Sequence, residues 1–482
     1  MSLDVTLDVF LKPRSVAVIG ATERPGSWGS FIMEGLIARE FPGRLFPVNR
    51  KGGQVYGRPA YKDVRQIEEP VELAVLAIPE EGVEEVVEAC GEKGVQGVTI
   101  ITAGFGEAVA GGRDRELALA RRARALGMRL LGPNVSGTFN LHARFNAAAS
   151  PAEHLRPSTL AAVCQGGYAF YDLLASAFSR KMGVGKFVHT GNECDLTVTD
   201  FLEYYGRDPE VEGVLMYLET VRDGRRFLEV ASRVARQKPV VVYKAGRTTG
   251  GARAARSHTG ALAGPRALYR GLLEQAGIVL SPTMELLVPL GHHLLERPPM
   301  RGRRVAIVTV GGSWGVSLTD TLEEAGLVVP ELSGPLQQTL RSLGMPVRAS
   351  TRNPIDIGAA GMLITVETLL PLARAVLSSG EVDALVLHGL GRPGMTDQNM
   401  PGRMKIYLML NKQVMQAFAG LEREIGRPVL IGNHFSPFES QVVHDLNEEG
   451  IRIINRLDEI AQLLFLMYDF WLRRGRVGET HV

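Results

Sequence analysis

The sequence predicts an α/β protein whose parallel sheets are covered by helices on both faces. Short runs of β-branched and other apolar residues alternate almost from end to end with longer segments whose apolar residues recur at helical spacing. This alternation is typical of βαβ units, in which a crossover helix joins two parallel strands. The chain has 482 residues, more than one hydrophobic core usually serves, so two to four domains are expected.

The first predicted domain spans residues 1–148. Its expected strands are the runs SVAVIGA, RLFPVN, LAVLAIP, GVTIITAGF and RLLGPN, the first of which starts at Ser15. A helix is predicted between the third and fourth runs, because the segment EEGVEEVVEACGEKG has apolar residues at helical spacing. The charged run RDRELALARRARALGMR is best interpreted as a helix with a solvated face. Together these elements predict one doubly wound domain.

Two further domains are predicted over residues 149–296 and 303–482. The first of them has the expected strands TLAAVCQGG, KFVHTGN, VEGVLMYLE and PVVVYKAG, with the helix TVTDFLEYYGR among them. The segment ERPPMRGRR combines two prolines with a charge cluster, as linkers often do. Beyond it, RVAIVTVGG, VDALVLHGL and RPVLIGNH predict strands, with a long helix before the last. Both domains open with a strand, a Gly-rich turn and a helix, which suggests that they are related.

Composition and charge narrow the classes of partner. The formal net charge is only +2, which argues against nucleic acid or an anionic membrane as a partner. The three cysteines are far apart and form no pattern typical of a metal site or a disulfide framework, so no metal ligand is expected in this chain. No run of 18 apolar residues and no secretory leader pattern occurs. We therefore expect a cytoplasmic protein.

A glycine-rich turn follows the first predicted strand. Gly20, Gly26 and Gly29 are spaced as G-x5-G-x2-G and not as the dinucleotide-binding pattern GxGxxG. The turn still offers free N–H groups and the positive end of a helix to a phosphate. The second strand ends in NRK at residues 49–51, where an NAD-binding fold usually has an acid. Basic residues suit a phosphorylated ribose, which leaves NADP and coenzyme A as ligand classes beside a merely solvated turn.

The segment YKAGRTTGGARAARSHTGALAG leads from a strand through a loop of Gly, Thr and Arg to His258 at a helix start. Its glycines allow a phosphorylated group to approach closely, and its arginines can offset negative charge. A nucleophilic histidine must be neutral and oriented, normally by a carboxylate bonded to its other ring nitrogen. Glu219, at the carboxyl end of the strand VEGVLMYLE, is the candidate for that carboxylate. A helix-capping histidine and a surface glutamate are the alternatives.

A second set of N–H donors is predicted at Gln165, Gly166 and Gly167, where another strand meets the start of a helix. These donors could face the same phosphate as His258. No nucleotide-binding loop of the form GxxxxGKS or GxxxxGKT occurs in the sequence. A phosphoryl group would therefore have to reach this chain from elsewhere.

Taken in order, these motifs resemble the ADP-forming acyl-CoA synthetases, relatives of the succinyl-CoA synthetase α subunit. The resemblance runs through VAVIGATERPGSWG, VNRKGG, TAGFGE, GPNVSG, GNECD, YLE, SHTGALAG, GGSWG and NPIDIG. It implies a Rossmann-like CoA-binding domain followed by two flavodoxin-like ligase domains, with His258 as the phosphorylated histidine and Glu219 as the carboxylate that steadies it. The CoA site that it implies consists of Gly20, Ala21, Thr22, Gly26, Trp28, Gly29, Asn49, Lys51, Ile78 and Pro79.

The resemblance also implies a reaction and a partner. Acyl-CoA, phosphate and ADP would be interconverted with a carboxylic acid, CoA and ATP through an acyl phosphate and a phosphohistidine. The ATP-grasp module of the family has no counterpart here, so a separate β subunit carrying ADP or ATP with Mg²⁺ is implied, in a hetero-oligomer. The other substrate would be a small carboxylic acid or its acyl-CoA.

Three departures from the family pattern bear on catalysis. Relatives usually have SQSGA where this chain has CQGGY, so a hydroxyl is missing at Gly166; Val135 replaces the cysteine of a GPNC-type segment, and residues 313–314 are Ser-Trp in place of Gly-Pro. A non-catalytic protein of the same fold that senses CoA or acts as a scaffold is therefore the alternative function. An NADP oxidoreductase is disfavoured by the glycine spacing and by the lack of a recognisable hydride-transfer constellation.

Overall fold

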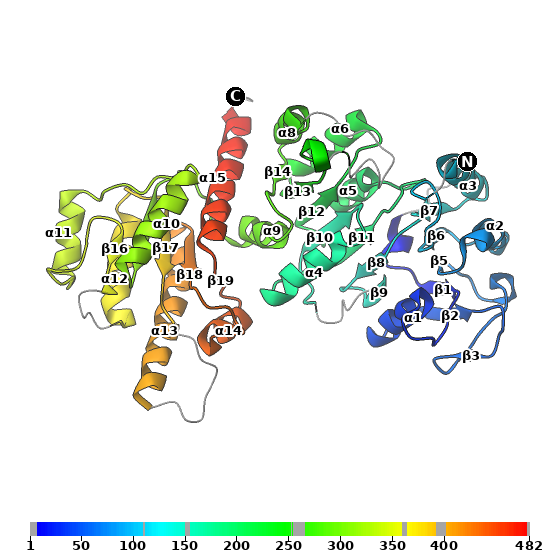
Figure 1. Cartoon of the computed structure of the whole chain (residues 1–482), viewed down its shortest axis with the longest axis horizontal. Coiled ribbons are helices and arrows are strands. Elements are labelled where there is room, and N and C mark those ends of the chain that lie inside the picture. Colours follow the sequence, from blue (N-terminus) through cyan, green and yellow to red (C-terminus); the bar gives the residue numbers. More distant parts are fainter. Residues whose placement is uncertain are drawn as a thin grey trace. The chain divides into compact units, whose positions relative to one another are not determined.

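The computed structural model describes residues 7–108, 111–149, 155–251, 253, 266–358, 364–391 and 402–479. The chain divides into two compact units (Figure 1). The first unit comprises residues 1–178 and 182–291, and the second comprises residues 179–181 and 292–482. His258 lies outside the described residues, so its predicted role stays a prediction. The three predicted domain ranges also stay predictions, and each unit is described below by itself.

The first unit begins with a parallel five-stranded sheet in the order β2-β1-β5-β6-β7. Neighbouring residues of a strand point to opposite faces, so Val16 and Val18 of β1 join one core cluster while Ala17 and Ile19 join another. The helix α1 packs on the first face, and α2 and α3 pack on the second. The elements are β1 (Ser15–Ile19), α1 (Trp28–Ala38), β2 (Arg44–Val48), β5 (Leu73–Leu76), α2 (Val83–Lys93), β6 (Gly97–Ile100), α3 (Gly112–Ala125) and β7 (Arg129–Leu131), with a small β3 (Gln54–Val55) and β4 (Arg58–Pro59) ribbon and 3₁₀ turns η1 (Leu7–Phe10), η2 (Val64–Gln66) and η3 (Glu80–Gly82).

The second sheet of this unit has seven strands in the order β14-β13-β12-β10-β11-β8-β9. Its five parallel strands repeat the connectivity of the first sheet, which is the doubly wound order that the sequence predicts. Their elements are β10 (Leu160–Cys164), α4 (Ala169–Ser179), β11 (Lys186–His189), α5 (Val198–Arg207), β12 (Gly213–Leu218), α6 (Gly224–Ala235), β13 (Val240–Lys244), α8 (Arg266–Gln275), β14 (Val279–Leu280) and α9 (Leu287–Glu296).

One part of this sheet departs from the sequence prediction. The hairpin formed by β8 (Gly137–Asn140) and β9 (Phe145–Ala148) was not identified as strands, and residues up to 148 were assigned to the first domain. In the structure, β8 pairs with β11 antiparallel, so the edge of the second sheet is made from this hairpin. Every residue of both strands is buried, which explains why no alternation of apolar and polar residues marks them.

The second unit holds a parallel sheet in the order β16-β15-β17-β18-β19, the same connectivity for a third time. Because all three sheets share this connectivity, it does not test the predicted relationship between the second and third domains. Among the helices of the described ranges, none is both long and apolar enough to span a membrane. The elements are β15 (Val305–Thr309), α10 (Gly312–Glu324), α11 (Gly334–Ser342), β16 (Ile355–Asp356), α12 (Val366–Ser378), β17 (Ala384–His388), α13 (Gly402–Ile425), β18 (Val429–Gly432), α14 (Gln441–Glu448), β19 (Ile453–Ile454) and α15 (Leu457–Glu479).

Candidate functional site

A cavity of ≈ 1220 Å³ lies in the first unit, where the carboxyl ends of strands from both of its sheets meet. In doubly wound sheets ligands bind at the carboxyl ends, beside the point where the strand order reverses, which here lies between β1 and β5. The cavity brings together residues that are far apart in the sequence. The predicted site residues that line it are Gly20, Thr22, Gly26, Trp28, Gly29, Asn49, Lys51, Ile78, Pro79, Gln165 and Gly167.

The predicted coenzyme A turn is closely packed. A Cβ atom at Gly29 would lie 2.0 Å from the carbonyl oxygen of Gly20, so glycine is required where the helix start meets the strand end. Asn49 donates from Nδ2 to the carbonyl oxygen of Ala21 (2.8 Å) and accepts from the backbone N–H of Lys51 (2.9 Å). Asn49 therefore shapes the turn, and Ala21 is buried within it without lining the cavity.

The two basic residues after β2 differ in their surroundings. Arg50 lies 3.7 Å from the carboxylate of Glu85, on the outer side of the turn. Lys51 is exposed and lines the cavity. Lys51 is thus the basic residue of the pair that is available to a phosphate bound there.

The predicted phosphate-binding turn is held by the amide of Gln165. Its Oε1 accepts from the backbone N–H groups of Glu219 (2.7 Å) and Thr220 (2.9 Å), and its Nε2 donates to the carbonyl oxygen of Thr220 (2.9 Å). These bonds fasten the end of β10 to the end of β12. A Cβ atom at Gly166 would lie 2.8 Å from the ring of Tyr217 and 3.2 Å from Oε1 of Glu219. Tyr217 and Glu219 therefore occupy the space that a serine side chain at residue 166 would need.

The carboxylate candidate Glu219 is buried beside this turn and does not itself line the cavity. Lys244, at the end of the neighbouring strand β13, donates from Nζ to the carbonyl oxygens of Glu219 and Ala245, both at 2.6 Å. Burial lowers the pKa of Lys244 to about 8, although the negative charge of Glu219 opposes this shift. Burial, together with Glu219, raises the pKa of Tyr217. A buried ammonium group thus fixes the backbone that carries Glu219.

His189, which no sequence motif predicts as a site residue, lines the cavity at the end of β11. Its Nδ1 accepts from the backbone N–H of Ser136 (2.7 Å), and its Nε2 lies 3.0 Å from the carbonyl oxygen of Gln165. These partners require a neutral ring that carries its proton on Nε2. His189 therefore joins the turn after β7 to the predicted phosphate-binding turn. The one feature of the sequence that points to His189 as a site residue is its position at the carboxyl end of a predicted strand.

A polar network on the segment after β11 was also missed. Arg113 of α3 donates to Glu116 (2.7 Å) and to the carbonyl oxygen of Asn192 (3.2 Å), and Asn192 donates to Glu116 (2.7 Å). Burial raises the pKa of Glu193, which accepts from the N–H of Val198 (2.9 Å). The helix predicted to have a solvated face thus contributes a cavity-lining arginine. Within the described ranges, no group of three or more His, Cys, Asp or Glu residues is placed to hold a metal.

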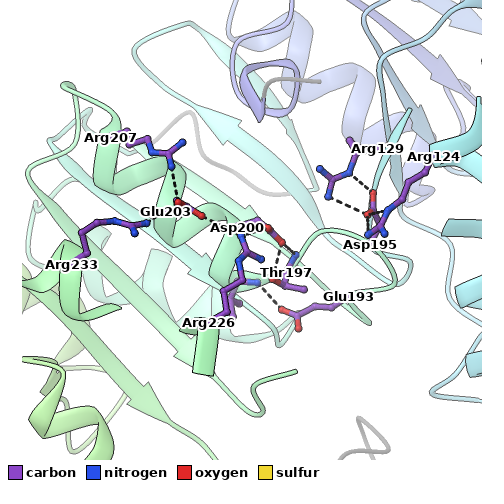
Figure 2. Close-up of polar contacts among 11 residues, drawn as sticks. Arg124, Arg129, Glu193, Asp195, Thr197, Asp200, Glu203, Arg207, Arg226 and Arg233 are labelled. Carbon is purple, nitrogen blue, oxygen red and sulfur yellow. Dashed lines mark hydrogen bonds and ion pairs between the residues drawn. The ribbon is translucent and has the colours of Figure 1, made fainter. Parts of the chain in front are cut away.

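Asp195 connects the two sheets of the first unit (Figure 2). Its fully buried carboxylate accepts from Arg124 and Arg129, and from the backbone N–H of Leu130 at 2.9 Å. Further along the same segment, Asp200 caps the start of α5 by accepting from the hydroxyl of Thr197 (2.8 Å). The segment after β11 is therefore anchored at both ends, to α3 and β7 and to α5.

The remaining departures from the family pattern lie in different units. Val135 is buried and lines the cavity of the first unit. In the second unit, Trp314 lies in the first turn of α10, and its ring centroid is 5.6 Å from that of His388 and 4.8 Å from that of His434. This residue is therefore packed among aromatic rings at the carboxyl edge of the third sheet.

Comparison with known families and proteins identifies two domains and several relatives. A CoA binding domain matches residues 14–139, and a succinyl-CoA ligase like flavodoxin domain matches residues 157–294. The α subunit of ADP-forming acetate–CoA ligase I from Pyrococcus furiosus is 39% identical over 357 residues, which cover 73% of this chain and 77% of that protein. The α subunit of ligase II from the same organism is 36% identical, with 79% and 81% covered.

Two further relatives extend the comparison. The ADP-forming acetate–CoA ligase of Methanocaldococcus jannaschii is 34% identical over 73% of this chain but only 49% of its own length. Among solved structures, the dinucleotide-forming acetyl-coenzyme A synthetase 1 of Ca. Korarchaeum cryptofilum, in complex with phosphate and ADP, has a TM-score of 0.84 and 31% identity over 99% of both chains. The predicted fold, a CoA-binding domain followed by flavodoxin-like ligase domains with mainly parallel sheets, is confirmed.

Proposed function

The chain belongs to the family of ADP-forming acyl-CoA ligases, as an α subunit, and on this premise we propose that its cavity is where the acyl group leaves coenzyme A. The reaction is acyl-CoA + phosphate + ADP ⇌ carboxylic acid + CoA + ATP. Coenzyme A is the cofactor that the CoA-binding domain serves. One observation carries the proposal: a single cavity is lined by both the predicted CoA turn at Gly20 to Gly29 and the predicted phosphate-binding turn at Gln165 and Gly167.

The chemistry has three balanced steps. A phosphate oxygen attacks the thioester carbonyl, the C–S bond breaks, and CoA leaves with a proton, so that an acyl phosphate forms. A ring nitrogen of His258 then attacks the phosphorus, and the P–O bond breaks to release the carboxylate. Finally the terminal oxygen of ADP attacks the phosphohistidine to give ATP and the free histidine. His258 is the nucleophile in this scheme, and Glu219 orients its ring by accepting from the other nitrogen.

The surroundings of Glu219 support this assignment. Glu219 directly follows β12 beside the predicted phosphate-binding turn, and its backbone is fixed on two sides by Gln165 and Lys244. Rigid support of this kind preserves the orientation that a catalytic carboxylate must provide. Backbone N–H groups at Gly166 and Gly167 are assigned to the phosphate, in place of the hydroxyl that this turn lacks.

The relatives are named α subunits, which implies a partner subunit. We assign to that partner an ATP-grasp fold that binds ADP or ATP with Mg²⁺, in a hetero-oligomer in the cytoplasm. Two observations support this: the sequence lacks a GxxxxGKS or GxxxxGKT loop, and this chain matches only about half of the ligase from Methanocaldococcus jannaschii. The acid is assigned to the class of small carboxylic acids, as in the acetate–CoA ligases.

The test is the complete reaction with purified components. We expect ATP to form from acetyl-CoA, phosphate and ADP only when this chain, its partner subunit and Mg²⁺ are all present. The lone chain should bind CoA but make no ATP, because it lacks a nucleotide-binding loop. CoA binding without turnover in the complete mixture would instead support the alternative, a non-catalytic CoA-sensing or scaffold protein.

A further inference from the structure

Three arginines line the cavity, Arg24, Arg113 and Arg222, and the last two differ in the groups that bind them. Arg113 of α3 is engaged by Glu116 at 2.7 Å and by the carbonyl oxygens of Asn192 at 3.2 Å and Glu193 at 3.4 Å. Arg222 follows β12, three residues beyond Glu219, and lines the same cavity. Glu219, the proposed catalytic carboxylate, and Arg222 therefore both lie in the segment that directly follows β12.

Arg222 has few protein partners in the part of the chain that the structure describes. Its Nη2 donates to the carbonyl oxygen of Asn192 at 2.8 Å, and no carboxylate of the described residues lies within ion-pair distance of it. A guanidinium group has five N–H donors in a fixed planar fork. Among the described residues, most of the N–H donors of Arg222 therefore have no acceptor and can bind a ligand that enters the cavity.

The charges around Arg222 favour an anion. Burial lowers the pKa of Arg222, the positive charge of Arg113 lowers it further, and Glu193 and Glu116 act in the opposite direction. The side chain is reached by solvent and yet partly desolvated, as expected for a group inside a cavity. Arg113 is paired with the carboxylate of Glu116, whereas Arg222 has no carboxylate partner among the residues that the structure describes. An oxyanion bound between the two guanidinium groups would neutralise the positive charge of Arg222.

We propose that Arg222 binds the oxyanion of inorganic phosphate before it attacks the thioester, and then the phosphoryl group of the resulting acyl phosphate. This inference rests on the proposed function. The arginine fork matches two oxygens of a phosphate, and its charge persists at all working pH values, so it takes no part in proton transfer. When the P–O bond to the acyl group breaks, Arg222 keeps its proton and the charge leaves with the carboxylate.

Three oxyanions could occupy the cavity: inorganic phosphate, the carboxylate of the acid product, and the phosphates of CoA. The position of Arg222 favours the first. It belongs to the strand end that carries Glu219 and lies beside Thr220, which Gln165 of the phosphate-binding turn holds. The CoA phosphates are assigned to the turn at Gly20 to Gly29 and to Lys51, on the other sheet.

The experiment uses the enzyme assembled with its partner subunit. In the direction that consumes acetyl-CoA, Arg222→Gln should raise the KM for phosphate about tenfold to a hundredfold, as expected for loss of a charge-assisted pair of hydrogen bonds. Arg222→Lys should retain part of the affinity, because it keeps the charge and loses the fork. The KM for acetyl-CoA should stay within about twofold, since CoA is bound elsewhere.

A matched control lies three residues further on. The side chain of Arg225 is 91% exposed, pairs with Glu229 at 3.2 Å and does not line the cavity. Arg225→Gln should therefore leave the KM for phosphate and the KM for acetyl-CoA unchanged. Isothermal titration with CoA adds a second readout: Lys51→Ala should raise the Kd about tenfold, through loss of a charge contact to a CoA phosphate, and Arg222→Gln should leave it unchanged.

The possible outcomes distinguish the phosphate-binding role of Arg222 from the proposed ligase function of the protein. An unchanged phosphate KM in an active Arg222→Gln enzyme would overturn the inference, and so would an increase confined to acetyl-CoA or to acetate in the opposite direction. Loss of CoA binding in Arg222→Gln would place Arg222 in the CoA site instead. If the wild-type enzyme with its partner shows no turnover at all, the proposed function fails rather than the assignment of Arg222.

Discussion

The fold lowers the pKa of Lys244, which lies beside the site. Its ammonium group is almost fully buried between the carbonyl oxygens of Glu219 and Ala245, and its Nζ lies 4.8 Å from the ring centroid of Tyr269. Among the described residues, Glu219 is the charged group that acts on its pKa, and the ring of Tyr269 lies beside its ammonium group. Burial lowers the pKa from 10.5 to about 8, so the folded protein releases this proton before the unfolded chain does.

This shift predicts how stability depends on pH. Below about pH 8, Lys244 is charged in both states, and burying the charge costs stability. Between about pH 8 and the ordinary value of 10.5, the unfolded chain binds a proton that the folded chain has released, so stability rises with pH. Lys244→Met removes this contribution. From pH 7 to pH 10, the free energy of unfolding should shift in favour of the wild type, relative to the variant, by on the order of 2 kcal/mol.

Urea unfolding followed by circular dichroism at several pH values measures this difference. Other titrating groups affect both proteins equally, so the comparison isolates Lys244. A difference between the two proteins that stays constant across this range would contradict the buried ammonium assigned here.

At the scale of elements, the turn between β10 and α4 shows why this chain has glycine where relatives have serine. The ring of Tyr217 and the carboxylate of Glu219 occupy the space that a side chain at Gly166 would need. Tyr217 is itself stacked on Tyr243, with ring centroids 5.8 Å apart. The glycine and the tyrosine therefore form one packing unit.

Gly166→Ser should consequently destabilise the protein by about 1–3 kcal/mol through overpacking, in spite of restoring the family hydroxyl. In a Tyr217→Ala background the same substitution should cost clearly less, because the obstructing ring is gone. A double-mutant cycle of unfolding free energies tests this coupling. Additive effects of the two substitutions would show that Tyr217 does not limit the space at residue 166.

The element scale also shows what the sequence pattern can predict. Buried apolar runs such as the one at Ser15 predicted the parallel strands, because a strand covered on both faces needs continuous apolar residues. The hairpin of β8 and β9 escaped notice because its strands, GTFN and FNAA, mix polar and apolar residues although all are buried. The polar side chains there are bonded internally, for example Thr138 to the carbonyl oxygen of Phe10 at 2.9 Å. Hydrogen bonds between residues so far apart in the chain cannot be predicted from the sequence pattern.

The same reasoning applies to the site. The position of the glycine turns and of Lys51 at the cavity could be predicted because each has a local motif beside a strand end. The positions of Arg113 and Arg222 at the cavity could not be predicted, because they depend on which elements become neighbours, and His189 offered only its place at a strand end as a signal. Arg113 in particular lies on a helix whose sequence is typical of a solvated surface, and only the tertiary structure brings it into the cavity.

At the scale of the first unit, Asp195 joins the two sheets between which the cavity forms. Its carboxylate is fully buried, whereas Arg124 and Arg129 are partly exposed. Asp195→Ala leaves two guanidinium groups and the N–H of Leu130 without their acceptor, so we expect a loss of about 2–4 kcal/mol in unfolding free energy. It should also weaken CoA binding, since the cavity walls belong to different sheets.

The control for this prediction is an exposed ion pair of the same unit. Glu229→Ala removes the partner of Arg225 on the surface of α6, and it should cost less than about 0.5 kcal/mol. Equal effects of the two substitutions in thermal or urea unfolding would indicate that Asp195 does not connect the sheets as described.

The proposed reaction passes a phosphoryl group through His258, and labelling with radioactive phosphate detects this intermediate. The chain, its partner subunit and Mg²⁺ are incubated with ATP labelled at the γ-phosphate, and acid-labile phosphate on the chain is counted and located by mass spectrometry. We predict label on His258 of the wild type and of the control variant His142→Gln, whose histidine lies on the surface beside Ser158. His258→Ala should carry no label, because the substitution removes the proposed nucleophile. Acid-labile phosphate that persists in His258→Ala would contradict the account.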